Sequence, residues 1–348
     1  MAMNNELMGL LSNVFKNDIK VTKLCPDIRG KVILISGSNN LGKTRQASKF
    51  PNPIFMPFEN GLNGVTNAMV LNSATWQEFR KNVKKLATDK RLLAMLEKEP
   101  ITIVMDNVKK SGIACQRFLE EKYDIQDISE GKDEGSRKVN LYGFYEKEYW
   151  STISQLFNKG YTVVGICHEE VDAKTGKTIP DKDKRSVGVF KDNADITIHL
   201  ESNGVDENGD TILSSGYMVE TEDFFARTRF PYMTTYLEEF TAENLINAIS
   251  EGIKRQIEVE GGEEVSFAEQ NSVYEGEQYT KDELVEIIKG LFDKMSEIDA
   301  EDEFDKIVDE NLGGKLISEA TDKQIQPLMA IKEEIEEFLT NNSEEAPF

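Results

Sequence analysis

An eight-residue loop pattern constrains this chain more than any other feature of its sequence. Residues 37–44 read G-x-x-x-x-G-K-T and directly follow the largely apolar run 31–36, so the loop joins an expected strand to an expected helix. Glycines in such a loop let backbone N–H groups surround phosphate oxygens, and the positive end of the helix dipole adds to the attraction. The pattern therefore predicts a nucleoside triphosphate site in an α/β fold; a plain glycine turn is the alternative.

Each member of this loop has an expected role. Lys43 would reach the β- and γ-phosphate oxygens, and the Thr44 hydroxyl would hold Mg²⁺. ATP and Mg²⁺ are therefore the expected cofactors. The other members would present backbone N–H groups to the phosphates: Gly37, Ser38, Asn39, Asn40, Leu41 and Gly42.

The charge distribution divides the chain into two unlike parts. Residues 241–348 carry 29 acidic and 9 basic side chains, a net charge of −20, whereas residues 1–240 carry 34 and 32, a net charge of −2. This shift predicts a boundary near residue 240. We expect a helix and an acidic linker over 241–278 and a small acidic helical domain over 279–340.

The composition argues against several classes of protein. No apolar stretch reaches the roughly 18 to 20 residues of a membrane helix, and the first residues lack the pattern of a signal peptide. We therefore expect a soluble protein of the cytoplasm, which is the host cytoplasm for a phage-encoded chain. The chain has three widely spaced cysteines and two histidines, so we expect neither a disulfide framework nor a zinc site.

Polar residues follow three further apolar runs. Glu59 comes after the run 53–58, Asp106 after 101–105, and His168 after 161–167. Such runs are typical of parallel strands buried on both faces, and ligands bind at the carboxyl ends of these strands. We therefore expect the three side chains to converge on the nucleotide.

Their chemistry suggests distinct roles. Asp106 would support Mg²⁺ beside Thr44, or cap the helix that follows it. Glu59 would polarise the attacking water, or be an ordinary turn residue. His168 would hydrogen-bond the γ-phosphate, or be a satisfied side chain at a strand end.

These segments give the chain a resemblance to RecA-like P-loop ATPase cores, and most closely to phage single-strand annealing proteins of the Sak type, which are AAA-domain nucleotide-binding proteins. The resemblance covers residues 31–240 and implies a mostly parallel central sheet. It implies that Glu59 is the catalytic glutamate and His168 the γ-phosphate sensor. The chain departs from the usual pattern at Pro57, where an aspartate is common.

The same resemblance implies a mobile DNA-contacting loop after the sensor, over residues 170–193. Acidic residues in this stretch leave it only marginally positive, so a solvated surface loop is the alternative. A second DNA loop would fall at 129–142, where Tyr142 offers a stacking ring. The expected DNA-binding residues of the first loop are Lys174, Lys177, Lys182, Lys184 and Arg185.

Two further features bear on assembly. The resemblance implies that Arg227 and Arg229, at alternate positions of an expected strand, complete the site of a neighbouring subunit in a ring or filament; a salt-bridged surface strand is the alternative. An apolar stripe over residues 5–17, within an N-terminal segment 1–30, would dock on a partner or on the chain's own core.

The last eight residues, 341–348, are expected to be a disordered acidic tip. Their end, Pro347 and Phe348, resembles the tip by which bacterial single-stranded-DNA-binding proteins recruit replication and repair partners. The acidic helical domain would also dock on proteins, mimic nucleic acid, or be a solvated bundle.

The leading hypothesis is an ATP-hydrolysing recombination protein that binds single-stranded DNA as a homo-oligomer and promotes annealing or strand exchange. The alternative is a nucleotide-gated adaptor that brings partner proteins to DNA. A small-molecule kinase is disfavoured because the chain lacks an arginine-rich lid segment. The sequence leaves three questions open: whether the bound polymer is DNA or RNA, whether the oligomer is a ring or a filament, and whether annealing needs ATP hydrolysis.

Overall fold

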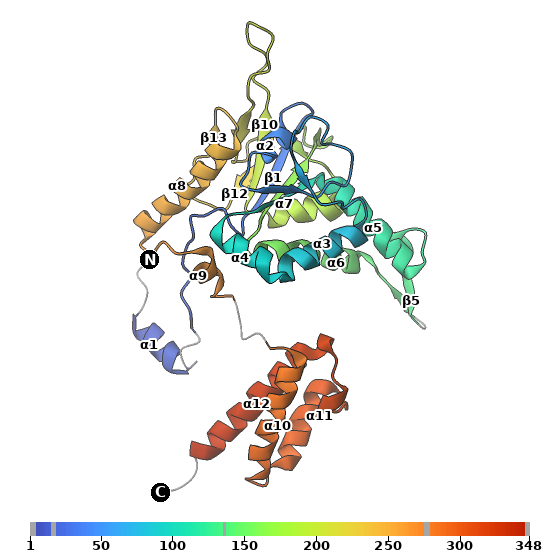
Figure 1. Cartoon of the computed structure of the whole chain (residues 1–348), viewed down its shortest axis with the longest axis vertical. Helices are drawn as coiled ribbons and strands as arrows, with labels where there is room; N and C mark the ends of the chain where they lie inside the picture. The colour runs from blue at the N-terminus through green and yellow to red at the C-terminus, as the bar shows by residue number, and fades with distance from the viewer. Residues whose placement is uncertain (1–4, 15–18, 135–136, 275–278, 345–348) are drawn as a thin grey trace. The chain divides into compact units, whose positions relative to one another are not determined.

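Two compact units make up the chain. The computed structural model describes residues 5–14, 19–134, 137–274 and 279–344. The first unit comprises Met1–Val273 and the second Tyr274–Phe348. Figure 1 shows the central sheet of the first unit and the helices of the second.

The central sheet of the first unit is mostly parallel, which confirms the predicted α/β class. Six parallel strands run in the spatial order β3-β2-β4-β7-β1-β10, and three short antiparallel strands extend the sheet at the β10 side. The strand β7 therefore lies between the strand that leads into the phosphate loop and the strand that ends in Asp106. The strands are β1 (Val32–Gly37), β2 (Pro53–Phe55), β3 (Met69–Val70), β4 (Thr102–Asp106), β7 (Thr162–Cys167), β10 (Ile196–Glu201), β11 (Ser215–Tyr217), β12 (Arg227–Thr228) and β13 (Tyr236–Leu237).

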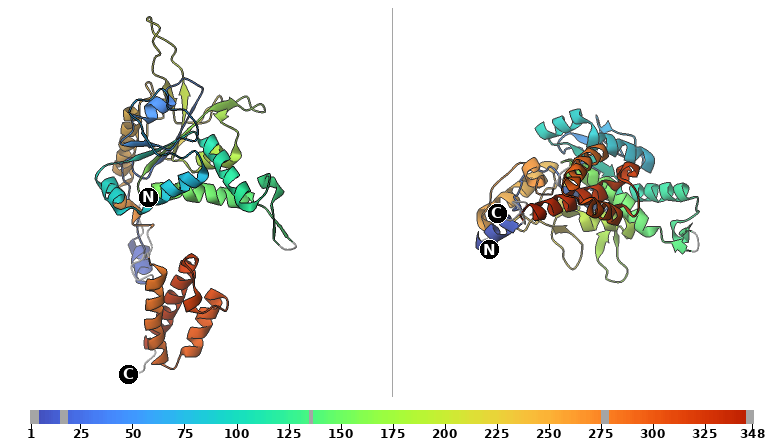
Figure 2. Two further views of the ribbon diagram at one scale, coloured as in Figure 1. Left: turned by 45° about the vertical axis from the view of Figure 1, so that its right-hand side comes forward. Right: turned by 90° about the horizontal axis from the view of Figure 1, so that it is seen from below.

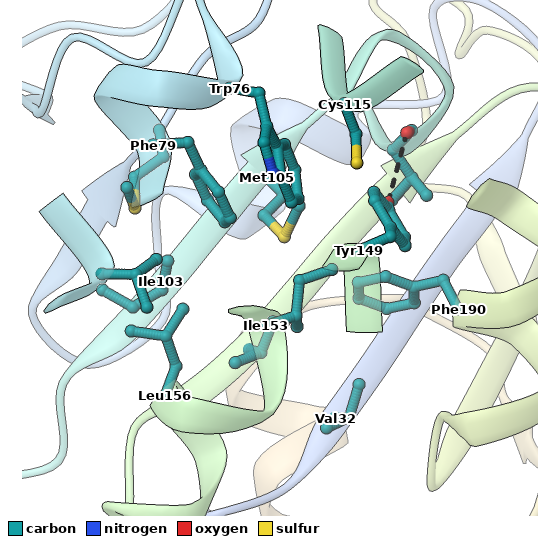
Figure 3. Close-up of a cluster of buried hydrophobic side chains, with 14 of the residues drawn as sticks. Val32, Trp76, Phe79, Ile103, Met105, Cys115, Tyr149, Ile153, Leu156 and Phe190 are labelled. Atoms are coloured by element: carbon teal, nitrogen blue, oxygen red, sulfur yellow. Dashed lines mark hydrogen bonds between the residues drawn. The ribbon is translucent and has the colours of Figure 1, made fainter. Parts of the chain in front are cut away.

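Helices cover both faces of this sheet, because alternate strand residues point to opposite sides. Val32 and Leu34 of β1 pack under one helical layer, and Ile33 and Ile35 pack under the other. Figure 3 shows the first cluster, in which the Trp76 and Tyr149 rings stack 5.3 Å apart. The first layer contains α3 (Trp76–Thr88), α4 (Lys90–Lys98), α5 (Val108–Tyr123), α6 (Tyr142–Asn158) and α7 (Val189–Asn193); the second contains α2 (Lys43–Ala47) and α8 (Ala242–Glu260).

Hairpins interrupt the alternation of strands and helices. The stretch expected as an irregular loop forms a hairpin of β8 (Glu169–Val171) and β9 (Thr178–Pro180), followed by one π-helical turn, Lys184–Gly188. Strands of three residues are too short to show a periodicity in the sequence. A second hairpin joins β5 (Lys132–Glu134) to β6 (Arg137–Val139), and a longer one at residues 202–214 projects beyond the end of β10 (Figures 1 and 2).

Part of the expected linker belongs to the first unit. Val265 donates its backbone N–H to the Leu24 carbonyl at 3.2 Å, and the ring of Phe267 lies against Gly30. A Cβ at Gly30, where φ is +71°, would overlap that ring. The short helix α9 (Phe267–Asn271) therefore packs on the start of the core, and the division between the units falls after it.

The helix α1 (Asn5–Val14) carries the N-terminal apolar stripe. Its side chains Leu7, Leu10 and Val14 are 50%, 60% and 65% exposed. Phe15, which completes the stripe in the sequence, lies outside the described residues.

The second unit is a small helical bundle, as the sequence predicts. Leu284, Ile288, Leu328 and Ile331 are fully buried in its core. Thr280 and Glu283 form a capping box at the start of the first helix. Among the described helices, none combines the length and the apolar character needed to cross a membrane. The three main helices are α10 (Lys281–Ser296), α11 (Glu301–Leu312) and α12 (Ile325–Glu344).

Candidate active site

The phosphate loop forms a tight connection between β1 and α2. Gly42 precedes the helix with φ of +75°, and Asn40 has φ of +65°, both in the left-handed region. A Cβ at Gly37 would lie 2.9 Å from Leu41 Cδ1, which is too close for a normal contact. The two pattern glycines are therefore required by the backbone conformation and by the close approach of Leu41.

Lys43 lies inside the curve of the loop. Its ammonium group donates to the carbonyl oxygens of Gly37 at 2.8 Å and Ser38 at 2.6 Å. The side chain is buried, and burial lowers the pKa of its amine. The loop thus holds the Lys43 ammonium group at its centre. Phosphate oxygens bound there would contact both this cation and the N-terminus of α2.

Thr44 and Asp106 are joined directly. The Thr44 hydroxyl donates to Asp106 Oδ2 at 2.8 Å. The strand β7 lies between β1, which leads to the loop that holds Thr44, and β4, which ends in Asp106. Burial raises the pKa of the Asp106 carboxyl, and the hydrogen bond from Thr44 opposes that effect. A hydroxyl and a carboxylate are the hard oxygen ligands that Mg²⁺ prefers, so this pair fits the expected metal.

Glu59 reaches the same place through Asn107. The backbone N–H of Phe58 donates to the Asp106 carbonyl at 3.1 Å, and Glu59 Oε1 accepts a hydrogen bond from Asn107 Nδ2. Asn107 also caps α5, because its Oδ1 accepts the Lys110 N–H at 2.9 Å. Asn107, and not Asp106, is therefore the helix cap. One sequence signal could have identified Asn107 as a site residue: it stands between the strand-end carboxylate Asp106 and an amphipathic helix.

His168 directly follows β7 and is exposed. It lies close enough to Asp106 that its positive charge, when protonated, lowers the pKa of that carboxyl. The carboxyl ends of β1, β2, β4 and β7 thus bring together Lys43, Thr44, Glu59, Asp106 and His168.

A buried polar group beside the loop was missed by sequence reasoning. Glu169 Oε1 lies 2.7 Å from the Ser36 hydroxyl and 2.8 Å from His199 Nδ1, and the Glu169 side chain is 3% exposed. The His199 ring stacks on Phe224 at 4.1 Å. The residues that meet here come from three strands and one loop, so local sequence patterns do not indicate them.

Comparison with known proteins agrees with this geometry. Residues 29–230 match the family model described as an AAA domain. The chain belongs to the AAA domain family. It is also 36% identical over 321 residues to the SPbeta prophage-derived uncharacterized protein YorG of Bacillus subtilis strain 168, an alignment that covers 92% of this chain and 97% of that protein. The AAA domain is thus the nucleotide-binding domain of a P-loop protein, and its relative is encoded by a prophage.

The hairpin β8–β9 of the AAA domain and the residues that follow it, through the turn Lys184–Gly188, carry the cations expected to contact DNA. Lys177 pairs with Glu220, and Lys182 Nζ donates to the Val171 carbonyl at 3.0 Å. The exposed Lys174 and Lys184 make no ion pair with any described residue. Part of the expected cation set is therefore held within the chain.

Arg185 and Tyr142 bring the two expected DNA elements together. The guanidinium of Arg185 lies 4.1 Å from the centroid of the Tyr142 ring. The residues of β5 and β6 themselves are described only as backbone. An open cavity of about 540 Å³ adjoins this pair and is lined by Tyr142, Tyr145, Glu146, Lys184, Arg185, Val189, Asp192 and Asn193.

Arg227 and Arg229 lie beside the amino ends of β10 and β1, whereas the phosphate loop follows the carboxyl end of β1. Arg227 donates to the Ala194 carbonyl at 2.9 Å, and Arg229 pairs with Asp195 at 3.4 Å. Asp195 accepts the N–H of Val32, the first residue of β1. The two arginines therefore do not join the nucleotide site of this chain.

Proposed function

We propose that this AAA protein hydrolyses ATP, binds single-stranded DNA as an oligomer and promotes annealing or strand exchange. One observation carries the proposal: the turn Lys184–Gly188, which bears the cations of the cavity, packs on α5, and α5 begins at Val108, directly after its cap Asn107 beside the site. A Cβ at Gly112 of α5 would overlap Ser186 of that turn. A second tie joins Lys109 to Asp181 at 2.7 Å. Nucleotide and DNA surfaces would thus share one helix.

The reaction would follow from the residues at the strand ends. Lys43 and the loop N–H groups would hold the phosphates, and Glu59 would orient water and accept its proton as the oxygen attacks the γ-phosphorus. The bond from that phosphorus to the bridging oxygen breaks, which yields ADP and phosphate. Thr44 and Asp106 would hold Mg²⁺, which when bound offsets charge on the phosphate oxygens.

DNA recognition would combine stacking with backbone contacts. Tyr142 offers a ring face for a base, while Lys184 and Arg185 offer charge to phosphates. Lys174 stands exposed at the tip of the hairpin and would add a further contact. Such contacts are independent of sequence, as annealing requires.

The position of Arg227 and Arg229 supports an oligomer. Because both lie far from the nucleotide of their own subunit, they would serve as fingers only for a neighbour. The exposed apolar side chains of α1 would contribute to the same assembly. Ring and filament both satisfy this geometry.

A nucleotide-gated adaptor is the second candidate, favoured by the hydrogen bond that occupies Glu59. An adaptor would bind ATP, change state and recruit replication or repair proteins through the acidic second unit. Pro347 and Phe348, the proposed partner tip, lie outside the described residues. Removal of both should abolish partner binding and leave ATPase activity unchanged; retained binding would exclude the tip.

The deciding experiment measures ATP hydrolysis with and without single-stranded DNA. We expect DNA to stimulate the full chain and Lys43→Ala to abolish hydrolysis. Glu59→Gln should bind ATP and DNA together without turnover in a recombinase, whereas an adaptor would keep its activity. Hydrolysis indifferent to DNA would contradict the recombination function and favour the adaptor.

A further inference from the structure

A lysine-rich surface on α3 and α4 has no part in the proposed ATPase reaction. Residues 80–98 contain seven basic and two acidic side chains, a local net charge of +5 in a chain of net charge −22. Arg80 pairs with Glu148, and Arg91 pairs with Asp89. The remaining five, which we call the lysine face, are exposed and make no ion pair with any described residue: Lys81, Lys84, Lys85, Lys90 and Lys98.

The fold explains why these lysines point outward but not why they are there. Phe79, Val83 and Leu86 bury the opposite side of α3, so Lys81, Lys84 and Lys85 share its solvent side. Like charges three and four residues apart on a helix destabilise it slightly. The stability of α3 therefore does not account for the cluster.

The lysine face belongs to the same helical layer as the cavity at Tyr142. Glu148 of α6 accepts hydrogen bonds from Arg80 at 2.9 Å and from Trp76 at 3.0 Å, which fixes α3 against α6. The first turn of α6, in turn, forms one wall of the cavity. Figure 1 shows α3 and α6 on one side of the sheet.

We propose that the lysine face binds the phosphate backbone of a second nucleic acid strand. The inference rests on the proposed function, since it assigns a site to the partner strand that annealing needs. Unpaired ammonium groups on flexible stems match a polyanion without reading its sequence. Leu92 and Met95 of α4, which are 37% and 51% exposed, add apolar area beside the cations for sugars and bases.

The test compares two triple variants of the full chain that lose equal charge. Lys81, Lys84 and Lys85 are changed to Gln in one, and the exposed Lys49, Lys159 and Lys254 are changed to Gln in the control. Each protein is first saturated with a labelled oligonucleotide. Capture of a second, non-complementary oligonucleotide is then measured at several salt concentrations.

We expect the lysine-face variant to lose about tenfold or more in second-strand affinity and about two units of its salt slope, since each phosphate contact contributes roughly 0.7. First-strand affinity, ATPase activity and the control should not change. Equal capture by both variants would overturn the inference. Unchanged capture with weaker self-association in sedimentation would also overturn it and identify an acidic protein surface as the occupant.

Arg185→Ala separates this inference from the proposed function. If it weakens only the first strand while the lysine-face variant weakens only the second, both proposals are supported. If Arg185→Ala has no effect, the cavity is not the first-strand site, while loss in the lysine-face variant still supports the second-strand site. A wild-type protein that binds no single-stranded DNA would end both.

Discussion

The two units of this chain treat polar groups in opposite ways. The first unit buries charged and polar side chains next to its phosphate loop, among them Lys43, Asp106 and His199. In the second unit, every buried side chain among the described residues is apolar, although residues 274–348 carry 22 acidic and 7 basic side chains. Burial of a charge is costly and is retained where chemistry needs it. The buried charges that nucleotide chemistry would use therefore lie in the first unit, whereas the charged side chains of the second unit lie on its surface.

Loss of the loop lysine should give the largest effect and should be confined to the first unit. We expect Lys43→Ala to lower ATP affinity and turnover about 100-fold or more, because a charge-assisted contact to phosphate disappears. In calorimetry, ATP at about 100 times the wild-type Kd should add about 2.7 kcal/mol to the unfolding free energy of the wild-type first unit and about 0.4 kcal/mol or less in the variant. An ATP-induced shift of the second unit's transition would contradict the division of roles.

Core truncations should separate the units energetically. Trp76→Ala should cost the first unit about 3–5 kcal/mol, and Ile331→Ala should cost the second about 2–5 kcal/mol, because both side chains are fully buried. Urea unfolding checks both. The chain's two tryptophans lie in the first unit, so Trp150 fluorescence follows it while circular dichroism at 222 nm follows both. A single shared transition would show that the units unfold together.

Cysteine reactivity offers an independent probe of the first unit. Cys25, Cys115 and Cys167 are buried, and burial raises the pKa of each thiol. We expect a thiol reagent at pH 8 to react about 100-fold slower than with a free peptide thiol. Urea that unfolds only the second unit should leave this rate unchanged; fast labelling there would mean that the first unit opens with it.

A pair of matched caps should give smaller and equal effects. Thr75 and Thr280 each form a capping box, the first at α3 and the second at α10. Replacement by Ala should cost about 1 kcal/mol in the unit that contains it, and Ser should restore most of that loss. Chemical denaturation of each variant measures the effect, and a cost in the other unit would argue for coupling.

The smallest effect is a pH dependence of opposite sign in the two units. A hydrogen bond from the Thr280 backbone lowers the pKa of Glu283, so its contribution is present above pH 4.5 and is lost as the pH falls through the lowered pKa. Burial raises the pKa of Asp195, so stability is greatest below pH 3.8 and is lost as the pH rises through the raised pKa. Glu283→Gln and Asp195→Asn should each flatten one of these slopes in stability measured against pH.

The sequence predicted what depends on neighbours along the chain. The phosphate loop and the polar residues at or just after the ends of β2, β4 and β7 were found because a strand and its end are contiguous in the sequence. The Glu59 to Asn107 hydrogen bond and the Ser36, Glu169 and His199 group were not found, because strand order decides which ends meet. Likewise, the alternate spacing of Arg227 and Arg229 predicts that both side chains point to the same side of a strand. It does not predict at which end of the sheet, near the phosphate loop or away from it, that strand lies.

The packing of residues 261–273 on the start of the core brings two distant positions of the first unit together. Besides the backbone contact at Leu24, Lys20 Nζ donates to the Ser272 carbonyl at 2.8 Å. The segments near residues 20 and 272 of the first unit therefore lie side by side in space. A circularly permuted first unit, in which a short glycine linker joins these two segments and the new ends lie in the exposed 202–214 hairpin, should keep the same sheet and the same nucleotide site.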